Sequence, residues 1–442
     1  MHDEVATTVL SFMVKSVTNK YRDVVALFPV EKLTANKLNT CFLSVIKQLV
    51  ETKFDVLAIL VDNHPINRSF FVNILCEGSL RPYIQNPLLP DRKLFLVFDT
   101  THTMKNIFNN FERKKVFSLP KFNDLQIESI CPNFHHCIEL FILEENLPLK
   151  YAHKLRKNYL APRSIEKVSV KPSLSIFHES TANALDVYAP KYNNSWTDTS
   201  AFIRLVIKLW NILNVKTTHL GKLKRDSSKD VITSHNDWKL CHLTSFCDFL
   251  DVWERDGVGL TKETFLALKS SLRALIELTQ HMLLIGFNYV RLGSMQSDPL
   301  ESRLGWYRQL SGSNYYISVK DLLHNERKIR ALSLLKFFKI SIEEINNKLN
   351  TDDCASKEVD EISSAISLNL ENWYELSDEE KGITYYIAGY IAHKLSQKMC
   401  IGCNENIFGD DNENTSERAF THEISRGGLK YPSTFLYSLG IK

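Results

Sequence analysis

Three carboxylates in this chain stand where a metal-dependent enzyme could use them. Asp62 and Asp99 each follow a run of apolar residues, and Glu301 falls at a predicted helix start far downstream. Carboxylate oxygens are the ligands that Mg²⁺ prefers, and two such ions can clamp the attacking and leaving oxygens of a phosphodiester. These residues therefore predict phosphodiester chemistry, provided that the fold brings Glu301 to the two aspartates.

Each carboxylate also has an ordinary structural explanation. An aspartate after a strand often stabilises a turn or caps a helix. The stretch Ser297–Gly312 predicts a helix with Asp298 at the N-cap and Pro299 at the first helical position. Glu301 then stands where a glutamate commonly returns a hydrogen bond to the cap, and spacing alone favours that role by about two to one. The choice depends on the surrounding elements.

The first third of the chain predicts a β-β-α-β-α-β-α order. β-branched and aromatic residues at 8–17 and 21–28 predict a hairpin, and Thr34 predicts the cap of the helix that follows. The apolar runs Phe54–Val61 and Lys93–Phe98 predict strands that are buried on both faces. In open α/β sheets the carboxyl ends of such strands face the functional crevice, so the two aspartates should share one edge.

The rest of the chain predicts helices and one acidic segment. Residues 118–290 contain long amphipathic patterns such as Ala201–Asn214, and Lys216–Lys229 predicts a basic polar loop. A basic amphipathic helix is predicted at Val319–Phe338, and residues 346–382 are acidic and polar. The nucleotide-binding loop patterns GxxxxGK[ST] and GxGxxG do not occur, which excludes nucleotide binding by those loops. The GxSxG pattern of the nucleophile elbow in α/β-hydrolases is also absent.

Composition places the chain among ordinary globular proteins. It has 442 residues, 44% hydrophobic and 24% charged, and a formal net charge of +3, which neither requires nor repels a nucleic-acid partner. Nine cysteines without a secretory signal indicate reduced thiols, and no apolar run is long enough to predict a membrane partner. Two groups of metal-ligand residue types lack the paired spacing of a zinc site. They are Cys400, Cys403, His393 and His422, and Cys131, His135, His136 and Cys137.

Several stretches together resemble the P-element and THAP-type transposases over essentially the whole chain. They are Ala6–Val14, Val61–Arg68, Phe98–Asn106, Tyr151–Leu155, Ile176–Leu185, Asp298–Gly312, Tyr386–Leu395 and Ile424–Ser433. The resemblance implies an α/β fold in which a ribonuclease-H-like core is interrupted by a mostly helical insertion. We expect core segments at 1–117 and 291–345, the insertion at 118–290, an acidic linker at 346–382 and a small helical C-terminal domain at 383–442.

The resemblance also implies roles for individual residues. Asp62 matches the second catalytic aspartate and Glu301 the catalytic glutamate, so both should bind Mg²⁺, whereas Asp99 resembles a structural or DNA-facing carboxylate. The side chains expected to meet DNA phosphates are Lys105, Arg303 and Arg308. In this family the insertion binds GTP, and the matching positions are Lys154, Asn211, Asn214 and Asp298. Because Asn211 stands where the family has an aspartate, we expect GTP binding to be weak.

The resemblance departs from the family at the front of the chain. The family's first catalytic aspartate precedes the hairpin, and a DNA-reading THAP domain precedes that strand, whereas this chain starts at the hairpin. We therefore expect a nuclear, transposase-derived protein that binds DNA, in which Mg²⁺-dependent cleavage and strand transfer are impaired, and which could form homo-oligomers. Two alternatives stay open at this point: a domesticated scaffold for DNA or protein contacts without chemistry, and an active enzyme with further sequence upstream.

Overall fold

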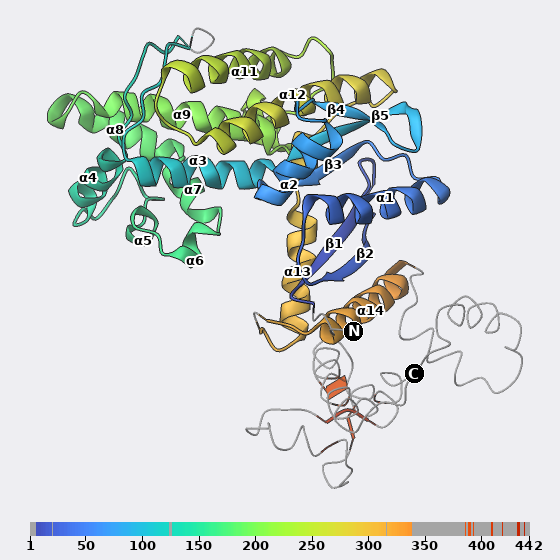
Figure 1. Cartoon of the computed structure of the whole chain (residues 1–442). Helices are drawn as coiled ribbons and strands as arrows, with labels where there is room; N and C mark the ends of the chain where they lie inside the picture. The colour runs from blue at the N-terminus through green and yellow to red at the C-terminus, as the bar shows by residue number, and fades with distance from the viewer. Residues whose placement is uncertain are drawn as a thin grey trace, which may run out of the picture. The chain divides into compact units, whose positions relative to one another are not determined.

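The computed structural model describes residues 6–19, 21–122, 126–314 and 316–337, with a few residues beyond them. Those further residues are 385, 388–389, 392, 408–409, 418, 431–433 and 437. The chain divides into two compact units, residues 1–332 and 333–442. Figure 1 traces the element order from the blue N-terminus.

The chain begins with an antiparallel hairpin and a helix, as predicted. Strands β1 (Thr8–Lys15) and β2 (Arg22–Val30) pair from Thr8 opposite Val30 to Lys15 opposite Arg22. Helix α1 (Ala35–Glu51) is capped by Thr34, whose hydroxyl accepts a hydrogen bond from the Lys37 N–H at 3.2 Å. Its periodic apolar residues are buried, and α1 packs against β2. A local pattern and a local cap thus suffice to define this helix.

A second, three-stranded sheet holds the strand ends with the carboxylates. Its order is β3 (Ala58–Val61), β5 (Leu89–Phe98) and β4 (Tyr83–Asn86). Strand β3 runs parallel to β5, with Val61 opposite Phe98, and β4 runs antiparallel to β5. The sequence prediction omitted β4, because four residues that end in Gln-Asn carry no apolar run. The helix predicted after β3 is also less regular, since α2 (Pro65–Ser69) continues into a π-helical turn, η1 (Phe70–Leu75).

The second half of β5, residues 94–98, is buried on both faces, as its apolar run predicts, whereas β3 is only half-buried, contrary to the prediction. Phe95 and Val97 belong to one hydrophobic cluster, while Leu94, Leu96 and Phe98 belong to another, and all five are 0% exposed. The second cluster contains residues of α1 and η1. The first extends into the helices that follow β5. The sheet is therefore covered on both sides and its end is held in a fixed position.

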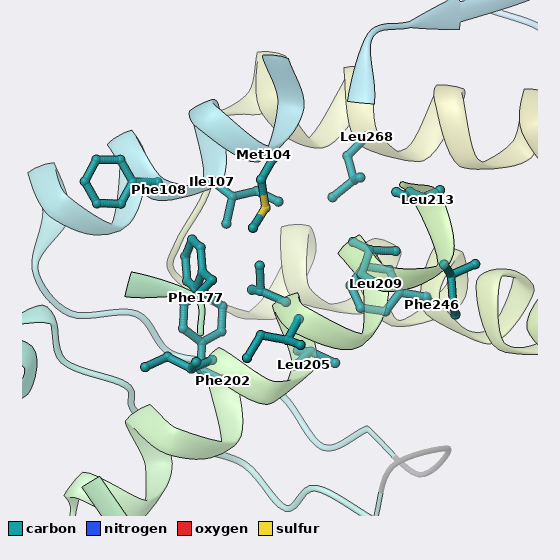
Figure 2. Packing of buried hydrophobic residues seen from close by; sticks show 14 of the residues in the cluster. Met104, Ile107, Phe108, Phe177, Phe202, Leu205, Leu209, Leu213, Phe246 and Leu268 are labelled. Atoms are coloured by element: carbon teal, nitrogen blue, oxygen red, sulfur yellow. The ribbon is translucent and has the colours of Figure 1, made fainter. Parts of the chain in front are cut away.

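The helical region shares its core with the sheet. Its longer helices are α3 (Thr100–Lys114), α4 (Phe134–Glu144), α8 (Glu179–Tyr192), α9 (Trp196–Leu213), α11 (Trp238–Asp256) and α12 (Lys262–Leu284). Figure 2 shows Met104 and Ile107 of α3 facing the apolar side of α9. Helix α12 packs on both α3 and β5. Its Ser271 hydroxyl accepts from the Phe98 N–H at 2.9 Å and donates to the Phe98 carbonyl at 3.0 Å, one residue before Asp99.

Shorter helical pieces connect these helices. They are α5 (Lys157–Leu160), α6 (Ser164–Lys167), α7 (Lys171–Ile176), α10 (Leu220–Lys224), η3 (Ser227–Lys229) and η4 (Leu292–Ser294). The basic stretch that was predicted as a plain loop therefore contains a helical turn and a 3₁₀ turn. The Lys167 ammonium of α6 binds the Glu112 carboxylate of α3 at 2.9 Å, with Lys115 at 3.4 Å from the same group.

Helix α13 (Asp298–Leu310) is followed by α14 (Val319–Phe337). Tyr307 is fully buried in a small cluster with Leu322 and Ile329, and apolar residues of the hairpin pack against that cluster. The Tyr307 hydroxyl donates to the Glu326 carboxylate, which also receives two hydrogen bonds from Arg303 at 3.0 and 3.1 Å. These bonds fix α13 against the hairpin and α14.

The second unit is described only at scattered positions. There the Arg418 guanidinium donates to the Tyr385 hydroxyl at 2.6 Å, and Phe408 forms a β-bridge with Pro432. The acidic segment 346–382 and the cysteine and histidine group from His393 to His422 lie outside the described residues. No helix among the described residues combines the length and apolarity that crossing a membrane requires.

Candidate metal centre

Asp99 follows β5 and caps α3, and its carboxylate also binds the start of α13. The Asp99 carboxylate accepts the Thr101 N–H at 2.6 Å, which satisfies the helix start. Its other oxygen accepts the Ser297 N–H at 2.8 Å and the Ser297 hydroxyl. Asp99 is 1% exposed. It therefore acts as a buried link between the sheet and α13, in keeping with the structural role expected for it.

Asp62 lies at the same edge of the sheet as Asp99. It follows β3, and the Asp99 N–H donates to the Val61 carbonyl at 2.8 Å across the parallel strand pair. Oδ1 of Asp62 accepts from the His64 N–H at 3.0 Å and from the Asn67 side-chain amide at 2.7 Å. Both bonds fall on one oxygen, so within the described contacts Oδ2 of Asp62 can still serve as a ligand.

Glu301 is carried to this edge by α13, one turn after Ser297. Its Oε1 lies 2.6 Å from Nε2 of His102, a residue 199 positions away in the sequence. That hydrogen bond and, to a lesser extent, the charge of Lys105 hold the pKa of Glu301 below its usual value, although partial burial opposes the shift. The Glu301 side chain is 49% exposed, so it combines a fixed orientation with access to solvent.

The capping prediction for this helix start is wrong in its details. Ser297, not Asp298, precedes the first helical residue, and it makes no side-chain cap bond. The strongest side-chain interaction of Glu301 goes to His102, and a hydrogen bond with Ser297 contributes less. Asp298 is the first residue of α13, and its carboxylate pairs with Lys216. The polar residues of this turn are used in tertiary contacts instead of local caps.

His102 and Lys105 complete the surroundings of Glu301. Both are on α3, and Lys105 Nζ lies 3.4 Å from His102 Nε2. Lys105 is 8% exposed, which does not suit the DNA-facing position expected for it. His102 was not selected from the sequence. Its signal was the spacing Asp99-x-x-His102, which places both residues on the same side of the first turn of α3.

The residues at this edge fit a divalent cation. Among the described residues, one group of three or more potential ligands converges, namely Asp99, His102 and Glu301, whose ligand atoms all lie within 4.8 Å of one another. All three already have hydrogen-bond partners, and an imidazole nitrogen suits Zn²⁺ more than Mg²⁺. Asp62 is not part of this group, although its carboxylate is an oxygen ligand of the kind that Mg²⁺ prefers.

Two of the four residues expected near a nucleotide, Asn214 and Asp298, lie where the end of α9 meets the start of α13. Asn214 ends α9 and accepts from the Gln296 amide at 3.3 Å, and Gln296 also donates to Thr100 at 3.1 Å. Gly293 allows this approach, because a Cβ there would lie 2.7 Å from the Asn214 backbone. Asp298 of α13 is held by Lys216, which follows Asn214 by two residues. The end of α9 thus meets the start of α13 directly.

Asn211 and Lys154 are the other two residues expected near a nucleotide. The Asn211 side-chain amide is 3.4 Å from Oδ2 of Asp226. Lys229 pairs with the same carboxylate at 2.6 Å, and both Lys154 and Lys229 act electrostatically on His178. Hydrogen bonds from Lys229 and Ser228 lower the pKa of Asp226, against the effect of its partial burial. Asp226 is a carboxylate beside Asn211 that sequence matching did not identify.

The remaining candidates are not arranged as a site. Arg303, expected to meet DNA, is instead bound to Asp23 at 3.0 Å and to Glu326, and its side chain is only 12% exposed. Arg308 is exposed on α13. Cys137 is fully buried, and burial raises the pKa of its thiol to about 12, whereas its neighbour Cys131 is exposed. That group of cysteines and histidines therefore gives no metal site.

Three segments of the chain match models of known protein domains. Residues 1–74 match the TNP-like RNase H N-terminal domain, residues 101–226 the TNP-like GTP-binding insertion domain, and residues 370–440 the C-terminal domain of DNA transposase THAP9. No curated protein matches the chain.

One solved structure shares the fold. The Drosophila P element transposase strand transfer complex matches with a TM-score of 0.62 and 16% sequence identity, over 74% of this chain and 74% of that chain. The fold is therefore a ribonuclease-H-like α/β core interrupted by a mostly helical insertion, as predicted. The three matched segments thus resemble domains of TNP-like proteins and of the DNA transposase THAP9.

Proposed function

We propose that this chain is a nuclear, transposase-derived protein that binds DNA and holds a divalent cation between Asp62 and Glu301. The observation that supports it is the meeting of α13 with the carboxyl ends of β3 and β5. Asp99 binds Ser297 across 198 residues of sequence, and His102 binds Glu301 across 199. Local structure alone would not require either contact, and both support a site in which the solvent-accessible Glu301 works with the strand-end carboxylates.

Each residue at this edge has a distinct role in the proposal. Asp62 and Glu301 bind the cation, which when present would polarise a phosphodiester oxygen. His102 orients the Glu301 carboxylate, and Asp99 holds the helix start that carries it. Lys105 supplies a nearby positive charge that favours the ionised form of Glu301.

The chemistry of this chain is proposed to be impaired. A two-metal clamp needs carboxylate oxygens on both ions, and the third carboxylate at this edge, Asp99, already accepts three hydrogen bonds. Losing such electrostatic stabilisation commonly costs about a hundredfold or more in rate. We therefore expect DNA and metal binding without detectable nicking or strand transfer by this chain.

Two measurements on the same preparations test this proposal. Electron paramagnetic resonance of added Mn²⁺ should show a bound ion that is lost in Asp62→Asn and in Glu301→Gln but retained in Glu128→Gln, an exposed glutamate elsewhere. Nicking of supercoiled plasmid with Mg²⁺ or Mn²⁺ should not exceed that of Glu301→Gln. Strong nicking that Glu301→Gln alone abolishes would contradict the impaired state. Absence of bound Mn²⁺ would instead favour a scaffold without chemistry.

We propose a second, weaker activity for the insertion, the binding of a guanine nucleotide. The observation that favours it is Asp226, which lies beside Asn211 and can offer the acceptor-only group that an amide lacks. We expect the nucleotide to bind weakly, because Asp226 is already paired with Lys229 and Asp298 is already paired with Lys216. A nucleotide has to displace these partners before it reaches the carboxylates.

Calorimetry tests the nucleotide proposal. GTP should bind weakly to the unmodified chain, and Asp226→Asn should remove what discrimination there is against ATP. Asp256→Asn, an exposed aspartate at the end of α11, is the matched control and should change neither. Asn211→Asp should bring little gain, because it places a second carboxylate against Asp226. Tight GTP binding that survives Asp226→Asn would contradict this assignment.

A further inference from the structure

Four cationic side chains gather beside the first turn of α13. Lys15 and Arg22 are directly opposite each other at the end of the β1–β2 pairing next to the hairpin turn. Lys216 follows α9, and Arg291 precedes α13. Three segments that are distant in the sequence thus contribute to one positive patch, which we call the hairpin patch.

Hydrogen bonds hold the hairpin patch in place. Lys15 Nζ donates to the Ser294 carbonyl at 2.5 Å, a contact that spans 279 residues of sequence. Lys216 Nζ pairs with the Asp298 carboxylate, and Arg291 donates to the Lys216 carbonyl at 3.4 Å. An ammonium has three N–H donors, so Lys15 retains donors beyond its bond to Ser294. Lys15, Lys216 and Arg291 are therefore held in position.

The hairpin patch carries an excess of positive charge. The pKa of Lys15 is lowered, chiefly by burial and further by the charges of Lys216, Arg22 and Arg291. The Asp298 carboxylate opposes this shift. One carboxylate thus stands among four cations. The side chains of Lys216 and Asp298 are 47% and 40% exposed, so a large anion can reach them. Like charges held this close repel one another, and an added anion would relieve the repulsion.

The patch lies next to the proposed metal centre. Asp298 and Glu301 are three residues apart in the first turn of α13, and residues at that spacing are surface neighbours on a helix. The N-terminus of α13 adds a partial positive charge at the same place. The patch and Glu301 are therefore joined through one turn of α13.

We propose that Lys15, Arg22, Lys216 and Arg291 bind a backbone phosphate of DNA and so align the strand with the metal centre. This inference rests on the proposed function and names the residues that would carry its DNA contact. Neither Lys105 nor Arg303 can do so without losing the contacts described above. The four cations come from an exposed strand end and two connecting segments, which suits a long polyanion. Contacts of this kind are salt-sensitive and independent of base sequence.

Fluorescence anisotropy of labelled duplex DNA with the full chain tests the proposal. Lys15→Gln, Arg22→Gln and Arg291→Gln should each weaken binding several-fold and reduce the slope of log K against log salt by about 0.9 per phosphate contact removed. Lys121→Gln, an exposed lysine paired with a glutamate elsewhere, is the matched control and should change neither. Asp298→Asn should strengthen binding, because it removes the carboxylate of the patch.

The outcomes separate this inference from the proposed function. Unchanged affinity and salt slope in the three variants, with DNA still bound, overturns the hairpin patch and leaves the metal centre untouched. If the three variants lose GTP binding but keep DNA binding, the patch binds the phosphate of a nucleotide, and the proposal is also overturned. If the unmodified chain binds no DNA, the patch and the DNA-binding part of the proposed function fail together, while Mn²⁺ resonance still reports on Asp62 and Glu301 independently.

Discussion

Replacing Asp99 by asparagine should loosen the start of α13 while leaving α3 capped. Asparagine is about as good an N-cap as aspartate, and its oxygen can still accept the Thr101 N–H, which Asp99 now does at 2.6 Å. The other position becomes an NH₂ group that faces the Ser297 N–H, so two donors meet. The substitution therefore removes the tertiary contact and keeps the local one.

The size of the effect follows from what is buried there. A hydrogen bond to a charged group contributes about 1.5–3 kcal/mol, and leaving a buried donor unsatisfied costs about 1–3 kcal/mol. Asp99 is 1% exposed, so water cannot easily replace the lost acceptor. Allowing for relaxation, we expect Asp99→Asn to reduce the free energy of opening of α13 by about 2–4 kcal/mol, which is about thirty- to several-hundredfold in the opening equilibrium.

Hydrogen exchange read by mass spectrometry can measure that opening in peptides that cover residues 298–310. Exchange there should accelerate in Asp99→Asn and less in Ser297→Ala, and the double variant should show a coupling of about 1–2 kcal/mol. Asn133→Ala, which removes a purely local side-chain cap from α4, is the matched control and should leave α13 unchanged. If Asp99→Asn alters exchange in α13 no more than Asn133→Ala does, the proposed link between the sheet and α13 is wrong.

Three further predictions concern stability and reactivity. Burial opposes ionisation of Glu112, but hydrogen bonds and charges of two lysines lower its pKa in the folded state. Ionised Glu112 therefore stabilises the fold at pH values above its unfolded pKa of about 4.5. This contribution is lost as the pH falls through the lower pKa of the folded state. Urea unfolding at pH 7 and pH 4 should show a smaller pH difference in Glu112→Gln. Tyr307→Phe removes the hydrogen bond to Glu326 and should cost about 1.5–3 kcal/mol in unfolding free energy, and a negligible cost would show that the bond does not stabilise the fold. In the native protein an alkylating reagent should label the exposed thiol of Cys131 quickly and the buried thiol of Cys137 far more slowly. Burial raises the pKa of the Cys137 thiol to about 12, so little reactive thiolate forms. Equal labelling rates would contradict the buried position of Cys137.

The strand-end aspartates could be predicted because their signals are local. An apolar run that ends in aspartate describes β3 and β5 without any knowledge of the fold, and a parallel pair brings both ends to one edge. The structure confirms the parallel pairing, with Val61 opposite Phe98. Strand β4 was not predicted, because its position depends on pairing with β5 and not on its own composition.

The partners of Glu301 could not be predicted from local signals. His102 is ordinary in sequence, and its role depends on a helix that begins nearly 200 residues later. Arg303 was expected to face DNA from the family resemblance, yet its guanidinium group binds Asp23 and Glu326. The sequence identifies the charge of such residues, but only the packing of α13 on the hairpin and α14 decides which of them remain accessible.

The first turn of α13 explains why capping rules failed where the function is proposed. Its three polar side chains each bind a different part of the chain: Ser297 binds Asp99 after β5, Asp298 binds Lys216 after α9, and Glu301 binds His102 on α3. No cap bond from the Ser297 side chain remains for the helix itself. The position of this turn is therefore set by three tertiary contacts, and a shift at any one of them would move the other two. A ligand that displaces Lys216 from Asp298 would consequently act on the orientation of Glu301, because both carboxylates belong to the same turn of one rigid helix.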